Sequence, residues 1–219
     1  PIFIGIQGPQ GSGKSTLVQQ LLKELPGKVQ FLSVDDLYLT NKEQSNLTSN
    51  PLLKYRGLPG THDIKLGKAV LESLNCRLET KVPRYDKSLL QGRGDRLPEN
   101  QWDSVSNDVD IVLVEGWCLG FQSLSSINYD CSQNQLGFNI EHLNQVNENL
   151  KEYEAEWYPY LDYFVQIKAD DIQYVYDWRW QQEQSLKLAK GEHAGLNHNQ
   201  VIDFVNRFMP MYELYLPQL

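Results

Sequence analysis

The feature that most constrains this chain is a glycine-rich segment near its start, GPQGSGKS at residues 8–15. It fits the pattern G-x-x-x-x-G-K-[ST], in which glycines let successive backbone N–H groups turn inward around phosphate oxygens. An apolar, β-branched run at residues 2–7 precedes it, and leucines at helical spacing follow it as far as Pro26. Strand, glycine loop and helix in this order predict a site for a nucleoside triphosphate, and not an ordinary strand-to-helix turn.

Different residues of this loop are expected to contact different parts of the nucleotide. Backbone amides from Gly11 to Lys14 are expected to hold the β-phosphate, and Lys14 to bridge the β- and γ-phosphates. Ser15 is expected to ligate Mg²⁺, and Thr16 to lie at the α-phosphate. The full set of candidate nucleotide-binding residues is Gly8, Gln10, Gly11, Ser12, Gly13, Lys14, Ser15 and Thr16.

Charge and composition narrow the classes of protein. The net charge of −8 argues against a general nucleic-acid binder, and no apolar run of about 18 residues predicts a membrane span. Cys76, Cys118 and Cys131 have no metal-ligand spacing, which favours reduced thiols of an intracellular protein. The chain starts at Pro1, so we expect an upstream segment, and a location in the cytoplasm or, after transit-peptide removal, in an organelle stroma. A monomer is slightly favoured.

Strand and helix patterns alternate along the chain. Apolar runs predict strands at residues 2–7, 29–34, 111–114 and 163–168, and apolar stripes predict helices at 64–74, 140–157, 172–188 and 198–215. Asn197 and Gln200 are placed as a capping box for the last helix. The alternation predicts an α/β fold: a doubly wound, mostly parallel sheet with helices on both faces, in one P-loop domain over residues 1–219.

In such a sheet, ligands bind beyond the carboxyl ends of the strands. Asp35 and Asp36 follow the second predicted strand, and Glu115 follows the third. One of the two aspartates is suited to accept the proton of an attacking hydroxyl, and Glu115 occupies the usual place of a carboxylate on the Mg²⁺ side. The alternatives are a turn or helix cap for each aspartate, and a structural ion pair for the glutamate.

Two glycine- and aromatic-rich segments, residues 54–63 and 81–96, carry basic side chains on this acidic protein. The second holds five Lys or Arg against two Asp, which suits capture of a small anion, although a solvated charged loop is the alternative. The acceptor-binding region is expected at approximately residues 41–100. Its candidate contact residues are Asp35, Tyr38, Arg56, His62, Arg84, Tyr85, Lys87, Arg93 and Arg96.

Arg179 lies in the helical pattern that follows the fourth strand. It is either a surface helix residue or an arginine on a lid that closes over the transferring phosphoryl group. The lid is expected at approximately residues 176–197, with a hinge at 191–195. Lys14, Asp35, Glu115 and Arg179 form the expected catalytic set, and Ser15, Asp35 and Glu115 the expected metal set.

Residues 8–15, 33–38 and 115–117 resemble the phosphoribulokinase, uridine kinase and pantothenate kinase group of small-molecule kinases. A closer likeness, to the plant-type D-glycerate 3-kinases, covers nearly the whole chain. It is carried by residues 55–57, 60–63, 82–88, 92–96, 115–121, 176–179 and 204–210.

This resemblance implies ATP-dependent phosphorylation of the primary hydroxyl of D-glycerate, giving 3-phosphoglycerate, with photorespiration as the process. It implies that Asp35 is the catalytic base or Mg²⁺ organiser, that Glu115 is the second carboxylate, and that Arg179 is the lid arginine. Two alternatives stand beside it. One is a kinase of the same group for another small acceptor, such as a nucleoside or pantothenate. The other is a nucleotide-binding regulator without catalysis.

Overall fold

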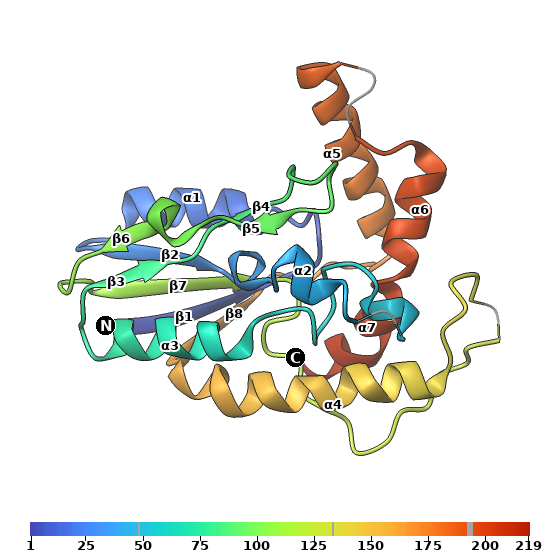
Figure 1. Ribbon diagram of the computed structural model, residues 1–219, viewed down its shortest axis with the longest axis horizontal. Coiled ribbons are helices and arrows are strands. Elements are labelled where there is room, and N and C mark those ends of the chain that lie inside the picture. The colour runs from blue at the N-terminus through green and yellow to red at the C-terminus, as the bar shows by residue number, and fades with distance from the viewer. Residues whose placement is uncertain (48, 133, 192–194) are drawn as a thin grey trace.

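The computed structural model describes residues 1–47, 49–132, 134–191 and 195–219. Its centre is a parallel sheet of β1 (Ile2–Gln7), β2 (Val29–Ser33), β7 (Ile111–Gly116) and β8 (Tyr163–Gln166), in the order β2-β7-β1-β8 (Figure 1). β1 and β7 pair from Ile2 and Ile111 to Gln7 and Gly116, so their carboxyl ends finish at the same edge. All four predicted strands are present, and the predicted parallel sheet is confirmed.

Strand ends differ from the sequence expectation in one way that matters for chemistry. β7 runs to Gly116, so Glu115 lies in the strand and not after it. The physical reason is that Glu115 has a partner on each side, Ile6 of β1 and Ser33 of β2. The glutamate is therefore held by the backbone of the sheet. β2 ends at Ser33, one residue earlier than expected, and β8 ends at Gln166.

Helices cover both faces of the sheet, as predicted (Figure 1). α1 (Lys14–Glu24) packs Val18 against Ile6 and Leu113 on one face. On the other face, α3 (Ile64–Asn75) and α4 (Ile140–Glu156) form a cluster with the strand side chains that point to that face. Alternation of side chains along each strand explains why neighbouring residues of β1 and β7 enter different clusters.

A third apolar cluster lies beyond the carboxyl ends of the strands. It is built on α4, α5 (Tyr174–Lys190), α6 (His198–Asn206) and α7 (Met209–Tyr215), and η5 (Leu216–Gln218) follows. The capping box of Asn197 and Gln200 is confirmed at the start of α6. The single helix expected over 198–215 was wrong, because Pro210 lacks a backbone N–H and occupies the first turn of a separate helix, α7.

The segments between β2 and β7 fold into short elements that were expected only as loops. η1 (Val34–Leu37), α2 (Asn41–Gln44) and η2 (Pro51–Leu53) precede α3. After α3 come two antiparallel ribbons, β3 (Thr80–Val82) with β6 (Asp103–Val105), and β4 (Tyr85–Asp86) with β5 (Asp95–Arg96). η3 (Glu99–Gln101) is a further 3₁₀ turn of this region, and η4 (Tyr158–Tyr160) follows α4. The basic segment 81–96 is thus largely a hairpin.

Within the described ranges, no helix has the length and apolar character needed to cross a membrane. Cys76 is exposed, Cys118 is buried and Cys131 lies between, and all three are free thiols.

Candidate active site

The glycine loop joins β1 to α1 at the carboxyl edge of the sheet. Gly13 adopts φ 89° and caps α1 without any side-chain hydrogen bond, so the first turn of the helix presents its backbone N–H groups. A Cβ at Gly13 would meet no atom within 4 Å, and the buried Ser12 hydroxyl has no hydrogen-bond partner among the described residues. Free donors around an open space fit the phosphates of a nucleotide.

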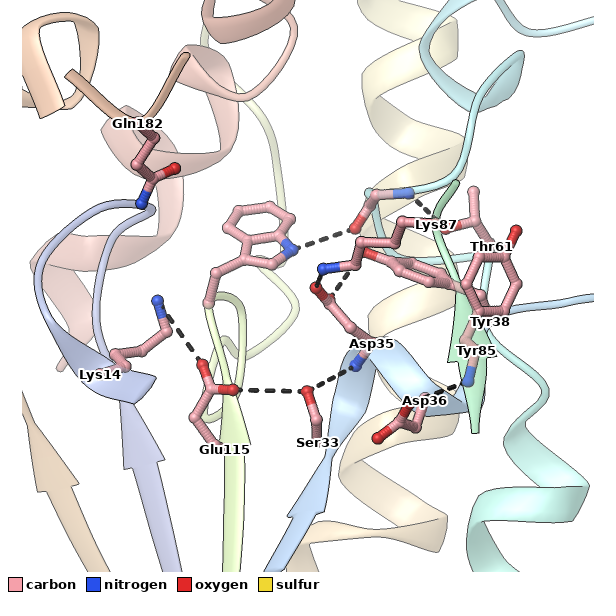
Figure 2. A network of polar contacts seen from close by, with 12 residues as sticks. Lys14, Ser33, Asp35, Asp36, Tyr38, Thr61, Tyr85, Lys87, Glu115 and Gln182 are labelled. Carbon is pink, nitrogen blue, oxygen red and sulfur yellow. Dashed lines mark hydrogen bonds and ion pairs between the residues drawn. The ribbon is translucent and has the colours of Figure 1, made fainter. Parts of the chain in front are cut away.

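Lys14 is turned toward the end of β7. Its Nζ donates to the Pro9 carbonyl at 2.9 Å and lies 3.6 Å from Glu115 Oε1 (Figure 2). Both side chains are buried, and burial lowers the pKa of Lys14 and raises the pKa of Glu115, while each partially offsets the shift of the other. Since Lys14 has no other acidic partner within ion-pair distance in the described structure, an incoming phosphate competes with Glu115 for it.

Asp35 lies in η1, directly after β2, and both of its oxygens are engaged. The Tyr38 hydroxyl donates to Oδ1 at 2.8 Å, and Lys87 Nζ lies 2.5 Å from Oδ2 (Figure 2). Burial alone would raise the pKa of Asp35, but the Lys87 ion pair and the hydrogen bonds lower it to about 2. Asp35 is therefore an ionised carboxylate at neutral pH.

Ser33 connects the two candidate carboxylates. Its Oγ accepts a hydrogen bond from the Asp35 backbone N–H at 3.3 Å and donates to Glu115 Oε2 at 3.4 Å. Figure 2 shows Lys14 and Glu115 on one side of this serine and Asp35 with Lys87 on the other. The arrangement can hold phosphate oxygens at the first pair and a hydroxyl at the second.

Asp36 has a different environment from its neighbour. It accepts from the Tyr85 backbone N–H at 2.9 Å and from Arg84 Nη1 at 2.6 Å, and Arg84 also pairs with Asp103. These contacts fix the β4 strand to η1. Asp36 therefore holds β4 in place, whereas Asp35 contacts Tyr38 and Lys87.

A group of packed aromatic rings lies behind Asp35. Tyr38 stacks on His62, with ring centroids 4.4 Å apart, and Tyr85 meets Tyr38 edge-on at 5.3 Å. His62 is 4% exposed, its Nδ1 lies 2.7 Å from the Tyr153 hydroxyl, and burial lowers its pKa to about 4. His62 was expected among the contacts to an anion, but the structure places it behind Tyr38 as a neutral ring.

Arg96 and Arg56, which were also expected to contact the acceptor, already have partners inside the protein. Arg96 binds Asp63 and the Tyr38 carbonyl, both near 3 Å. Arg56 lies over the Tyr85 ring and donates to the Gly92 and Arg93 carbonyls. Of the basic residues expected to contact the acceptor, Lys87 is the one that forms an ion pair with a catalytic candidate, Asp35.

Arg179 lies in α5, beside the glycine loop. Its guanidinium pairs with Glu183, 4% exposed at its side chain, and covers the Phe204 ring at 4.6 Å. Trp178 packs against Gly11, where a Cβ would overlap it, and Gln182 points toward the loop (Figure 2). The expected lid thus adjoins the phosphate site, with Arg179 turned onto its own helix. Residues 192–194 of the expected lid and hinge lie outside the described residues.

Gln7, Trp117 and Tyr212 also belong to the site and were not anticipated from the sequence. The Gln10 backbone N–H donates to the Tyr212 hydroxyl at 3.0 Å, and Gln7 Nε2 donates to the Trp117 carbonyl at 2.9 Å. Trp117 Nε1 donates to the Gly57 carbonyl at 3.1 Å and so connects the end of β7 to the acceptor region. Gln7 could have been found from the sequence, because it is a polar residue at the end of the apolar strand β1. Tyr212 could not, because it lies 202 residues from its partner and no local pattern marks it.

The side chains at this edge of the sheet also indicate how Mg²⁺ could be bound. The described residues contain no group of three or more His, Cys, Asp or Glu that could hold a metal by themselves. Kinase Mg²⁺ is typically bound by one or two carboxylates together with phosphate oxygens and waters. The exposed Ser15 hydroxyl at the start of α1 and the Glu115 carboxylate fit such a site.

A parallel sheet in this order, with a phosphate loop after β1 and carboxylates at the ends of β2 and β7, defines a P-loop kinase. No family model matches the chain. The chain is 41% identical over 230 residues to the chloroplastic D-glycerate 3-kinase of Arabidopsis thaliana, and 41% identical over 231 residues to the uncharacterized kinase mug58 of Schizosaccharomyces pombe. It covers 48% of the plant relative's length and 82% of the yeast relative's.

A solved structure of D-glycerate 3-kinase from Cryptococcus neoformans superposes with a TM-score of 0.86 at 37% identity. That match covers 99% of this chain and 79% of the other. This chain belongs to the D-glycerate 3-kinase family of P-loop kinases.

Proposed function

We propose that this chain is an ATP-dependent kinase that transfers the γ-phosphoryl group to the primary hydroxyl of D-glycerate, giving 3-phosphoglycerate and ADP. One observation carries the proposal beyond the family relationship. Two carboxylates at one sheet edge, Glu115 and Asp35, each hold a lysine, Lys14 from the phosphate loop and Lys87 from the acceptor region. A nucleotide binder without catalysis needs only the first pair.

The phosphate half of the reaction belongs to α1 and its loop. The backbone N–H groups at the start of α1 bind the β-phosphate, and Lys14 leaves Glu115 to bridge the β- and γ-phosphates. Bound Mg²⁺ supplies neutralisation of the charge on those oxygens, with Ser15 and Glu115 as the residues that would hold it. Asp35 is the third expected ligand, and its ion pair with Lys87 supports a role toward the acceptor.

The acceptor half belongs to Asp35 and Lys87. Asp35 accepts a hydrogen bond from the glycerate hydroxyl and orients its oxygen toward the γ-phosphorus. As that oxygen forms its bond to phosphorus, the bond to the β–γ bridging oxygen breaks, the hydroxyl proton passes to Asp35, and ADP leaves. If Lys87 turns to the carboxylate of glycerate, Asp35 loses its cation, its pKa rises, and it becomes a stronger base.

A panel of acceptors tests this proposal. The purified chain with ATP and Mg²⁺ is offered D-glycerate, L-glycerate, uridine and pantothenate in turn, and ADP release is followed by a coupled assay. We expect turnover with D-glycerate and a product identified as 3-phosphoglycerate. Turnover confined to uridine or pantothenate would assign the chain to another acceptor, and ATP binding without turnover on any of them would favour a regulator.

We further propose a single kinase domain with its acceptor region at approximately residues 41–100 and its lid at approximately 176–197, acting as a monomer. Light scattering tests the monomer. The plant relative is named as chloroplastic. The proposed location here is the cytoplasm, or an organelle stroma, and a fluorescent fusion to the natural gene product distinguishes the two.

A further inference from the structure

Arg207, at the junction of α6 and α7, carries a cation whose N–H groups have no acceptor in the described part of the chain. Its guanidinium lies over the Tyr55 ring, 4.6 Å from the centroid. Asp203, one turn earlier in α6, favours the charge without forming an ion pair with it. The residue is half-buried, and burial lowers the pKa of its guanidinium. Partial burial costs this cation part of its hydration, which a bound anion can replace.

Three arginines of the expected acceptor region differ from Arg207 in this respect. Arg84 binds Asp36 and Asp103, Arg96 binds Asp63, and Arg56 donates to two backbone carbonyls. Each of these three guanidinium groups is therefore engaged inside the protein, although Nε of Arg96 has no partner among the described residues. Stacking on Tyr55 occupies only the face of the Arg207 guanidinium and leaves the N–H groups along its edge for an anion.

The surroundings of Arg207 connect it to the active site. Tyr55 lies two residues before Gly57, whose carbonyl accepts from Trp117 Nε1. Gly57 is so close to Phe208 that a Cβ there would lie 2.6 Å from the ring, and Trp117 meets Phe208 edge-on at 5.0 Å. Trp117 follows Glu115 by two residues, so contacts through Phe208, Gly57 and Trp117 connect the Arg207–Tyr55 pair to the end of β7.

We propose that Arg207, held flat by Tyr55, binds the carboxylate of the acceptor and so selects hydroxy acids over neutral alcohols and nucleosides. This inference rests on the proposed function and names a specificity residue for it. Lys87 and Arg207 then approach the acceptor from two different elements, the β4–β5 hairpin and the α6–α7 junction.

A purely structural role for Arg207 makes a different prediction. If the arginine only packs on Tyr55 to close the α6–α7 junction, its loss lowers stability and weakens every acceptor equally. If it binds the acceptor carboxylate, its loss weakens only acceptors that carry that charge.

The test compares Arg207→Gln and Arg207→Lys with the matched control Lys23→Gln, a charge removal in the last turn of α1. For each variant, KM and kcat are measured with ATP, with D-glycerate and with the uncharged amide of D-glycerate, and folding is checked by thermal melting. We expect Arg207→Gln to raise KM for D-glycerate about 30-fold or more. KM for ATP and kcat/KM for the amide should stay within about twofold of the wild type, and Arg207→Lys should recover part of the loss.

An unchanged KM for D-glycerate in folded Arg207→Gln overturns the inference and leaves the proposed function standing. An equal loss with the amide overturns it as well, because the role is then structural. If Arg207→Gln does not fold, the same comparison is made with Arg207→Lys, for which a KM within about twofold of wild type for D-glycerate counts against the proposal. Absence of D-glycerate turnover by the wild-type chain overturns the proposed function and this inference together.

Discussion

At the scale of single residues, the adjacent carboxylates of Asp35 and Asp36 have different environments because they face different partners. Asp35 is held by the Tyr38 hydroxyl and by the Lys87 ammonium group. Asp36 is bound by a backbone N–H and by Arg84, which also pairs with Asp103. The sequence shows two equivalent aspartates after a strand, and only their contacts make Asp35 the one that we propose for chemistry and Asp36 the one that holds β4 to η1.

We expect Asp35→Asn to lower kcat by a factor of about 10² or more, because the amide cannot accept the hydroxyl proton. Affinity for ATP should be nearly kept, since Lys14 and the loop amides are untouched. Stopped-flow or coupled assays give kcat, and nucleotide titration gives the affinity.

The matched control is Asp36→Asn, which removes a similar charge one residue away. It should lower thermal stability by loosening the contact between η1 and β4, with a smaller effect on kcat in the folded protein. Near-normal turnover in Asp35→Asn would remove that residue from the role of base.

At the scale of elements, the phosphate loop depends on α5 as well as on α1. Gly11 has φ 82° and packs directly against Trp178, so both its backbone conformation and the space beside it require glycine. The sequence predicts the first requirement from the motif. The second comes from a contact between residues 167 positions apart, which no local pattern encodes.

Gly11→Ala should therefore raise KM for ATP by about tenfold or more, because the new methyl group displaces either the loop or α5. Gly92→Ala is the matched control: it has a similar φ of 86° but open space around a Cβ. Both variants should lose about 1–2 kcal/mol of stability from the left-handed backbone. A similar KM for ATP in the two variants would show that contact with Trp178 is unimportant.

Helix boundaries show the same division between local and long-range causes. The start of α6 follows from a capping box in the sequence, and its end follows from Pro210, which the apolar stripe over 198–215 obscured. The β3–β6 and β4–β5 ribbons escaped prediction because strands of two or three residues are too short for an alternating pattern.

At the scale of the whole molecule, the site is supported by a buried titratable group. The ordinary pKa of a histidine is 6.5, and burial lowers the pKa of His62 to about 4 in the folded protein. Between these values the unfolded chain binds a proton that the folded chain does not. The free energy of unfolding is therefore highest above pH 6.5 and falls as the pH decreases toward about 4.

We expect the urea midpoint of the wild type to fall through this window, with a slope in free energy of at most about 1.4 kcal/mol per pH unit from this group. His62→Phe should flatten that part of the profile. His198→Gln, at the first residue of α6, serves as a control and should retain the dependence that His62 causes. An unchanged slope in His62→Phe would place the titration elsewhere.

The sequence by itself determined the phosphate loop, the parallel α/β sheet and the carboxylates at its edge, because these depend on short-range patterns of glycine and apolar residues. The tertiary structure alone decided which charged groups remain available to bind a ligand. Pairing of Arg84 with Asp103, burial of His62 behind Tyr38, and stacking of Arg207 on Tyr55 join residues far apart in the chain. The free energy of a charge depends on what surrounds it, and those neighbours are chosen only when the chain folds.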